Sequence, residues 1–187
     1  MSDTREMSPT HPLKYFEACD GTVQAQVREL ITNGRLGDYI RSKYQEAHEA
    51  RDDRALFQAA VELKNRFLRN TPPLNKVMYD SRLQVLSHAL GTHTRISRVQ
   101  GPRLKTSREI RVATVFREAP AAFLKMILVH ELAHMKETEH TKAFYQLCTH
   151  MAPDYFQLEF DLRLYLTLVE GREDQGSVGG RARGDRA

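Results

Sequence analysis

Three residues near the middle of the C-terminal half, His130, Glu131 and His134, form the pattern His-Glu-x-x-His, and a third histidine, His140, follows them. On a helix, His130 and His134 lie one turn apart, so that both imidazole rings can reach one ion. A zinc ion held there would lower the pKa of a bound water towards about 7, and Glu131 would accept its proton. The pattern therefore predicts a metal-dependent hydrolytic site.

The helix that carries this pattern is predicted to be buried. It would begin at Pro120 and run to about Lys136, and nearly all of its residues outside the histidine–glutamate stripe are apolar. Two lysines fall on roughly the opposite side of the helix, where they can reach solvent. Because buried polar groups need partners, a metal and its water explain the stripe better than two core histidines bonded to backbone carbonyls.

His140 can join the site only if the helix ends before it. On a continuous helix it would lie about 9 Å beyond His134 and point about 120° away. The polar stretch KETE at 136–139 is a suitable break, and the helix expected at 141–151 has an apolar stripe that suits a new orientation. A turn within this stretch would bring His140 back over the metal.

Other side chains near the pattern have less specific predicted roles. Glu137 and Glu139 remain alternatives to His140 as the third ligand. A transition-state oxyanion would bind the metal and one further donor, for which Tyr145 and Tyr155 are candidates, although packing is the alternative role of both rings. The remaining histidines have no spacing partner and are expected at the surface or at helix ends: His48, His88, His93 and His150.

The rest of the chain must position the helix with the metal pattern. Helical periodicity extends over residues 13–73, which are expected to form an N-terminal helical subdomain. Residues 74–170 are expected to form the core, with a small sheet beside the active-site helix, so the predicted fold class is α+β. Residues 1–12 and 171–187 are polar and are expected to be disordered tails.

Three short segments of the core are predicted to be strands. The clearest is SREIRVATVF at 107–116, in which Ile110, Val112, Thr114 and Phe116 alternate with the residues between them. The other two are NKVMYDSR and TRISRV. A last helix is expected from about Tyr155 to Val169.

Composition and charge narrow the class of protein further. The chain has 187 residues, 41% hydrophobic and 28% charged, and no apolar run approaches the roughly 18 residues of a membrane span. The N-terminus lacks the apolar core of a secretory signal. The two cysteines, Cys19 and Cys148, are far apart and form no metal pair. We therefore expect a cytoplasmic protein with free thiols and no membrane partner.

Basic residues gather just before the metal pattern. The formal net charge is +4, and the segment 95–117 holds seven basic residues and one acidic residue, Glu109. The segment is either a solvated strand face or a groove for a nucleotide or nucleic acid. Its basic residues are Arg95, Arg98, Arg103, Lys105, Arg108, Arg111 and Arg117.

The stretch ILVHELAHMKETEHTKAFYQLCTHMAPDY resembles the YgjP-like metallopeptidase family, and the resemblance covers about residues 94–156. It implies three histidine ligands on zinc, a catalytic glutamate and a zincin-like fold. SprT-like metalloproteases that act on DNA-bound proteins share this layout, and some family members are described as nucleotide hydrolases. The Trp-Gly pair that often precedes the family's strand is missing, since the chain has no tryptophan. The matching positions are His130, Glu131, Leu132, His134, His140, Phe144, Pro153, Asp154 and Tyr155.

Three functions follow from these residues. The first is a zinc metallopeptidase for peptide or protein substrates, in which water activated by Glu131 attacks the carbonyl and the strand at 108–116 pairs with the peptide. The second is a metal-dependent nucleotide phosphohydrolase that uses the basic segment. The third is a zinc-stabilised nucleic-acid-binding module without catalysis, although structural zinc sites do not need a glutamate base.

Overall fold

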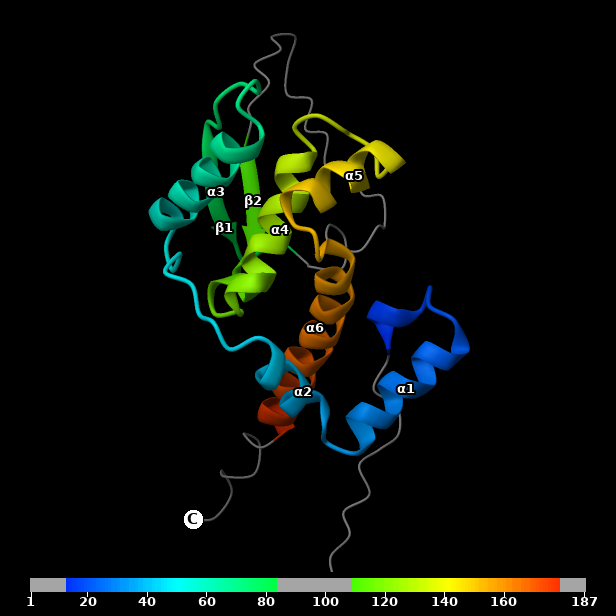
Figure 1. The fold of residues 1–187 in the computed structure, drawn as a ribbon. Coiled ribbons are helices and arrows are strands. Elements are labelled where there is room, and N and C mark those ends of the chain that lie inside the picture. Colours follow the sequence, from blue (N-terminus) through cyan, green and yellow to red (C-terminus); the bar gives the residue numbers. More distant parts are fainter. Residues whose placement is uncertain (1–12, 84–108, 179–187) are drawn as a thin grey trace, which may run out of the picture. The chain divides into compact units, whose positions relative to one another are not determined.

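The structure is a computed structural model that describes residues 13–83 and 109–178 (Figure 1). The expected tail at 1–12, the TRISRV strand, His88 and His93 lie outside the described residues, as does most of the basic segment. Within the described part, the protein is mainly helical and has one two-stranded parallel sheet. This mixture confirms the α+β class. None of the helices in this part is long and apolar enough to cross a membrane.

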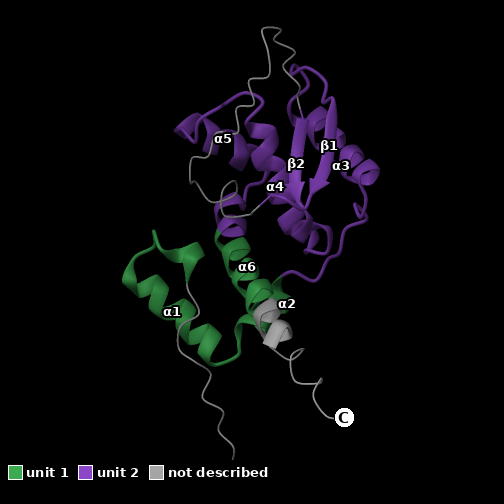
Figure 2. Cartoon of the chain, turned by 180° about the vertical axis from the view of Figure 1, so that it is seen from behind, with its two compact units in different colours: residues 1–43, 160–187 green, residues 44–159 purple. Residues whose placement is uncertain are grey.

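The chain divides into two compact units, one formed by residues 1–43 and 160–187 and the other by residues 44–159 (Figure 2). The first unit contains the 3-10 helix η1 (Lys14–Phe16), α1 (Gly21–Thr32), α2 (Leu36–Lys43) and the greater part of α6 (Tyr155–Val178). The second contains α3 (Asp53–Phe67), β1 (Lys76–Asp80), β2 (Glu109–Ala113), the 3-10 helix η3 (Thr114–Arg117), α4 (Ala121–Ala133), α5 (Lys142–Met151) and the start of α6.

In the first unit, a buried carboxylate links α2 to α6. The side chain of Asp161 has no exposed surface. One of its oxygens accepts the Tyr39 hydroxyl at 3.0 Å, and the other lies 2.5 Å from the ammonium of Lys43. Because an unpartnered buried carboxylate costs several kcal/mol, these two partners are what allows Asp161 to occupy the interior.

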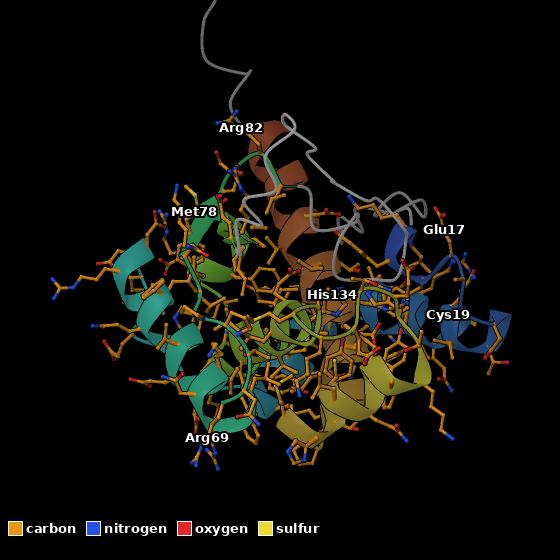
Figure 3. The ribbon with its side chains drawn as sticks, turned by 90° about the horizontal axis from the view of Figure 1, so that it is seen from above. Glu17, Cys19, Arg69, Met78, Arg82 and His134 are labelled. Carbon is orange, nitrogen blue, oxygen red and sulfur yellow. The ribbon has the colours of Figure 1, made fainter. Side chains whose placement is uncertain are left out.

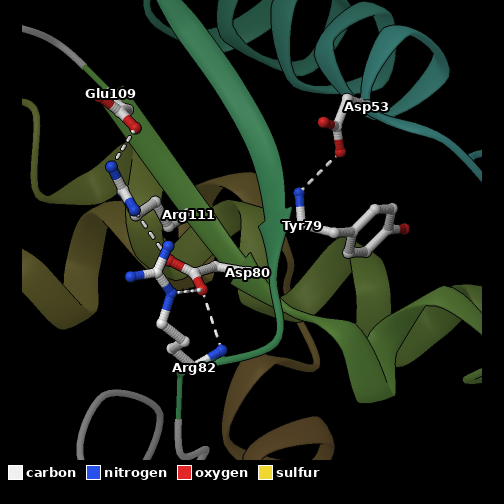
Figure 4. Close-up of polar contacts among 6 residues, drawn as sticks. All are labelled: Asp53, Tyr79, Asp80, Arg82, Glu109 and Arg111. Atoms are coloured by element: carbon white, nitrogen blue, oxygen red, sulfur yellow. Dashed lines mark hydrogen bonds and ion pairs between the residues drawn. The ribbon is translucent and has the colours of Figure 1, made fainter.

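The sheet of the second unit is formed by β1 and β2, with Val77 opposite Ile110 and Tyr79 opposite Val112. These four side chains are buried. Helix α3 packs against β1, and Asp53 in its first turn accepts the backbone N–H of Tyr79 at 2.9 Å (Figure 4). The boundary expected at residue 73 does not coincide with the division into units, because α3 belongs with the sheet.

The strand predicted over 107–116 is shorter than expected. It ends at Ala113, and the next four residues form η3. Ala113, the last residue of β2, and Phe116 within η3 are both buried. The alternating pattern therefore predicted the burial of Ile110, Val112 and Phe116 but not that of Ala113, and it predicted a strand where the chain forms a 3-10 helix.

The C-terminal helix is longer than expected. It was predicted to end near Val169, with a disordered tail from residue 171, but α6 continues to Val178. A single glycine inside a helix costs only about 1 kcal/mol relative to alanine. The residues after Gly171 include arginine, glutamate and glutamine, which favour helices, and none is proline. Gly171 therefore does not end the helix.

Candidate metal centre

Helix α4 places the His-Glu-x-x-His pattern inside the second unit. Pro120 occupies the position before its first residue, and the N–H of Ala121 donates to the carbonyl of Glu46 at 2.8 Å. The helix contacts α3, α5 and β2, which accounts for its burial on several sides. Its buried residues are Phe123, Leu124, Met126, Ile127, Leu128, Val129, His130, Leu132 and Ala133. The apolar helix predicted around the pattern is therefore confirmed.

The predicted break between His134 and His140 is also present. Helix α4 ends at Ala133, slightly before the expected Lys136, and His134 is its C-cap (Figure 3). The N–H groups of Met135 and Lys136 donate at 3.0 Å to the carbonyls three residues before them, Leu132 and Ala133, so the chain tightens into a turn after α4. The next helix, α5, starts with Thr141 as its cap.

The turn brings the three histidines together. Their Nε2 atoms are separated by 3.3 Å for His130 and His134, 3.2 Å for His130 and His140, and 3.1 Å for His134 and His140. Tetrahedral zinc with Zn–N bonds of about 2.0–2.1 Å requires nitrogens about 3.3–3.4 Å apart. Three nitrogens at this spacing occupy one face of a tetrahedron and leave its fourth corner open. The donor set therefore fits a zinc ion with one position for a reactant.

The tautomer of His134 follows from its second nitrogen. Nδ1 of His134 lies 2.9 Å from the carbonyl oxygen of Glu137. A carbonyl only accepts, so Nδ1 carries the proton, and Nε2 of the neutral ring presents its lone pair to the other two histidines. A lone pair aimed at two further ring nitrogens is favourable when a cation lies between them.

An aromatic side chain fixes the three imidazoles from one side. Phe144 on α5 is completely buried, and its ring centroid lies 5.0 Å from that of His130, 4.6 Å from His134 and 4.7 Å from His140. Phe144 excludes water on that side and limits rotation of the rings. This position corresponds to the aromatic residue of the family pattern, and its contact with all three rings explains why an aromatic side chain suits it.

Glu131 is held in a setting that suits a proton acceptor. It is half-buried on α4, between the two histidines of the pattern in sequence. The loss of solvent around its carboxyl raises its pKa from 4.5 to about 7. A cation bound by the neighbouring imidazoles would lower this pKa again by stabilising the carboxylate. Glu131 would then be ionised near neutral pH and able to accept a proton.

The two candidate oxyanion donors occupy different places. The Tyr155 side chain is buried, and its hydroxyl oxygen lies 2.7 Å from Nδ1 of His130, the ring nitrogen that does not face the other two histidines. Tyr155 is therefore committed to a histidine instead of the reacting group. The Tyr145 ring lies beside His140, with centroids 6.2 Å apart. Spacing alone did not reveal the Tyr155 contact, because Tyr155 is 25 residues from His130.

The other predicted positions lie outside this cluster. Among the described residues, the converging group of possible metal ligands consists of the three histidines and includes neither Glu137 nor Glu139. His48 is bonded through Nε2 to the carbonyl of Phe116 at 2.9 Å. His150 packs edge-on against Phe67. These contacts support structural roles for the isolated histidines that the structure describes.

Three converging imidazoles, with a glutamate on the helix that carries His130, define a metallohydrolase-type site with the donor set of zinc enzymes. The family model described as "YgjP-like, metallopeptidase domain" matches residues 75–165. A curated relative from Escherichia coli (strain K12), named UTP pyrophosphatase, is 59% identical over 155 residues, which is 83% of this chain and 93% of the relative. The chain belongs to the YgjP-like family. No solved structure matches it.

Proposed function

We propose that this protein is a zinc-dependent hydrolase that cleaves nucleoside triphosphates to the monophosphate and pyrophosphate. The observation that carries this choice of substrate is its 59% identity to the UTP pyrophosphatase, over 93% of that protein's length. The three-histidine centre supports the hydrolytic class independently of the substrate. We also propose that the sheet and α4 form a zincin-like core, as the family pattern implies.

In this proposal, His130, His134 and His140 hold the zinc ion through Nε2. The ion would supply a Lewis acid for a phosphoryl oxygen and would lower the pKa of water. Glu131 accepts the proton as the water oxygen bonds to the α-phosphorus. The bond from that phosphorus to the α–β bridging oxygen breaks, and pyrophosphate leaves with the bonding electrons. Tyr145, beside His140, is the remaining candidate for a further oxyanion donor.

Two arginines of the basic segment already have partners in the protein. The guanidinium of Arg111 lies 2.8 Å from a carboxylate oxygen of Asp80 and 2.8 Å from one of Glu109 (Figure 4). The guanidinium of Arg117 lies over the ring of Tyr79, at 4.9 Å. Neither arginine is thus an obvious phosphate ligand. Binding of a nucleotide or a nucleic acid by the rest of the segment stays a proposal that involves undescribed residues.

A peptidase is the second candidate, because the family description and the His-Glu-x-x-His pattern both favour it. The same residues would serve a peptide carbonyl. Glu131 would accept the proton of water and return it to the leaving amine. The two candidates differ in the substrate and not in the metal ligands, so only a comparison of substrates separates them.

The test measures pyrophosphate release from UTP, CTP, ATP and GTP, and peptide cleavage in a denatured-casein digest, with zinc-loaded protein. The variants are Glu131→Gln and, as a matched control, Glu62→Gln on the exposed face of α3. We expect pyrophosphate release that falls by about 10²–10⁴-fold in Glu131→Gln and is unchanged in Glu62→Gln.

Other outcomes would change the assignment. Peptide cleavage that depends on Glu131, without pyrophosphate release, would replace the first candidate with the second. Zinc binding without hydrolysis of either substrate would contradict both and favour the non-catalytic nucleic-acid-binding module. That module further predicts an affinity for nucleic acid that falls steeply with salt.

A further inference from the structure

The Pro-Asp-Tyr motif after α5 has no role in the chemistry described above, yet it ends on a side chain that contacts the metal centre. The N–H of Tyr155 donates to the carbonyl of Ala152 at 3.0 Å, so the chain turns over Pro153 and Asp154 before α6 begins. This turn places the Tyr155 ring in the core, 1% exposed. Its hydroxyl reaches Nδ1 of His130 at 2.7 Å.

The two rings are arranged for an in-plane hydrogen bond. The planes of Tyr155 and His130 differ by 14°, and their centroids are 6.5 Å apart. At this separation the rings do not overlap face to face; the hydroxyl instead approaches the edge of the imidazole, where the N–H or the lone pair of Nδ1 lies. The contact is therefore a directional hydrogen bond to one ring nitrogen.

The direction of this bond decides whether His130 can bind a metal. A neutral imidazole carries one proton, and zinc needs a bare nitrogen. If Tyr155 donates to Nδ1, the ring proton lies on Nε2 and blocks the metal-facing nitrogen. If Tyr155 accepts from Nδ1, Nε2 is bare. A hydroxyl can do either, unlike the carbonyl that fixes the tautomer of His134.

The Tyr155 hydroxyl has a second partner that can set this direction. The Tyr155 hydroxyl is also hydrogen-bonded to the thiol of Cys148 on α5. Sulfur can accept a phenol proton. Cys148 is completely buried, and burial raises the pKa of its thiol to about 12, so it remains a neutral, unreactive sulfur near pH 7. A phenol that donates its only proton to this sulfur presents oxygen lone pairs to His130.

We propose that Tyr155 is a positioning residue that holds His130 with its proton on Nδ1 and its Nε2 bare for zinc, and that Cys148 orients the Tyr155 hydroxyl for this task. The chain of contacts runs from Cys148 through Tyr155 to His130. It extends the metal centre beyond its three ligands and assigns a function to the Pro-Asp-Tyr motif. It depends on the metal site and applies to either candidate substrate.

The first test reads the histidine tautomers in the protein with its own sequence. Long-range ¹H–¹⁵N NMR of metal-free full-length protein at about pH 8 reports which ring nitrogen of each histidine carries the proton; the His130 signals are assigned by comparison with a His130→Gln variant. We expect the Nδ1–H tautomer of His130 to dominate before zinc is added. Dominance of the Nε2–H tautomer would overturn the proposal.

The second test measures zinc affinity by competition with a chromophoric chelator, with zinc alone as the ligand. Tyr155→Phe keeps the ring and removes the hydroxyl, and we expect zinc to bind about 10–100-fold more weakly. Cys148→Ala should cause a smaller loss, below about tenfold, and Cys148→Ser, which restores an acceptor, should lie nearer the parent.

The matched control is Tyr79→Phe. Tyr79 is a buried tyrosine of the same unit whose hydroxyl donates to the carbonyl of Ala50 at 2.6 Å, away from the three histidines. This variant should lose stability without losing zinc affinity. Parent-like zinc binding by Tyr155→Phe, or an equal loss in Tyr79→Phe, would contradict the proposal. If Tyr155→Phe does not fold, unchanged zinc binding by Cys148→Ala would contradict the role of the sulfur.

Discussion

Each of the two units of this protein contains a polar cluster around one buried side chain, Asp161 in the first unit and His130 in the second. The two clusters differ in whether the chain completes them. In the first unit, the carboxylate of Asp161 is matched by the ammonium of Lys43 and the hydroxyl of Tyr39. In the second unit, three imidazole nitrogens approach within 3.1–3.3 Å of one another. At least one of them, Nε2 of His134, presents a lone pair to the others.

This difference separates a structural cluster from a ligand site. Opposite charges that meet inside a protein stabilise each other, and no further group is needed. Converging lone pairs repel until a cation joins them, so a cluster of this kind indicates a bound ion. The hydrogen bonds at the Nδ1 atoms agree with this interpretation. Nδ1 of His134 is bonded to a backbone carbonyl and Nδ1 of His130 to the Tyr155 hydroxyl, so that both Nε2 atoms face the site.

The largest expected effect comes from removing one of the three nitrogens. His140→Ala should weaken zinc binding by more than the roughly 10–100-fold typical of an outer partner, because a direct ligand is lost. His150→Ala, whose ring only packs against Phe67, is the control and should bind zinc like the parent. Isothermal titration of metal-free protein measures both. If the His140 variant and the parent bound zinc with equal affinity, the three histidines would not be a ligand site, and the distinction from the structural cluster around Asp161 would be lost.

The second expected effect concerns pH and the carboxyl of Glu131. Its pKa in the folded, metal-free protein is about 7, above the ordinary value of 4.5, so the folded state binds more protons than the unfolded state between these values. The resulting stability is complete below about pH 4.5 and is lost as the pH rises through 7. Over this range the loss is at most about 3 kcal/mol.

Urea denaturation of metal-free wild type and Glu131→Gln at pH 5 and pH 8 measures this effect, since the other titrating groups are common to both proteins. The stability of the glutamine variant relative to wild type should increase towards pH 8. Zinc should reduce this dependence, because a cation lowers the pKa of Glu131. A pH-independent difference would show that burial of Glu131 does not disfavour its ionised form.

The third expected effect tests the first unit's cluster. Lys43→Met leaves the buried carboxylate of Asp161 without its ammonium partner and should lower the free energy of unfolding by about 1–3 kcal/mol. Arg41→Met breaks an exposed ion pair with Asp38 and should change it by less than about 1 kcal/mol. Zinc affinity should not change in either variant. A loss of zinc binding in Lys43→Met would show that the clusters are energetically coupled.

The smallest expected effect concerns Arg111, whose charge is matched by Asp80 and Glu109. In Arg111→Gln, the KM for a nucleoside triphosphate should change by no more than about twofold, as for ordinary surface substitutions. Steady-state pyrophosphate release measures it. A large increase in KM would show that Arg111 leaves its carboxylate partners to bind phosphate.

The sequence predicted the metal centre more completely than the rest of the molecule. The apolar helix, its end after His134 and the return of His140 all follow from periodicity and from the need of buried polar groups for partners. These are local features, spread over only a few helical turns. Helix geometry alone showed that His140 had to be preceded by a break, and the end of α4 at Ala133 with the turn after it is that break.

Features that depend on contacts between distant segments were not predictable in this way. Periodicity indicated α3 as a helix, but not that it packs on β1 and belongs with the sheet. Alternation marked Phe116 as buried, but a 3-10 turn buries it as well as a strand does. Spacing alone makes Tyr155 a candidate oxyanion donor, because spacing cannot show that its hydroxyl meets Nδ1 of His130.

The most direct test of the account is zinc K-edge X-ray absorption of the zinc-loaded, full-length protein. The arrangement of the three Nε2 atoms predicts one zinc per chain with three imidazole nitrogens at about 2.0–2.1 Å and one oxygen in the fourth position. In the His140→Ala variant, the imidazole contribution should be reduced or zinc should be absent. Fewer than three imidazoles in the parent, or a sulfur ligand from Cys148, would contradict the proposed centre.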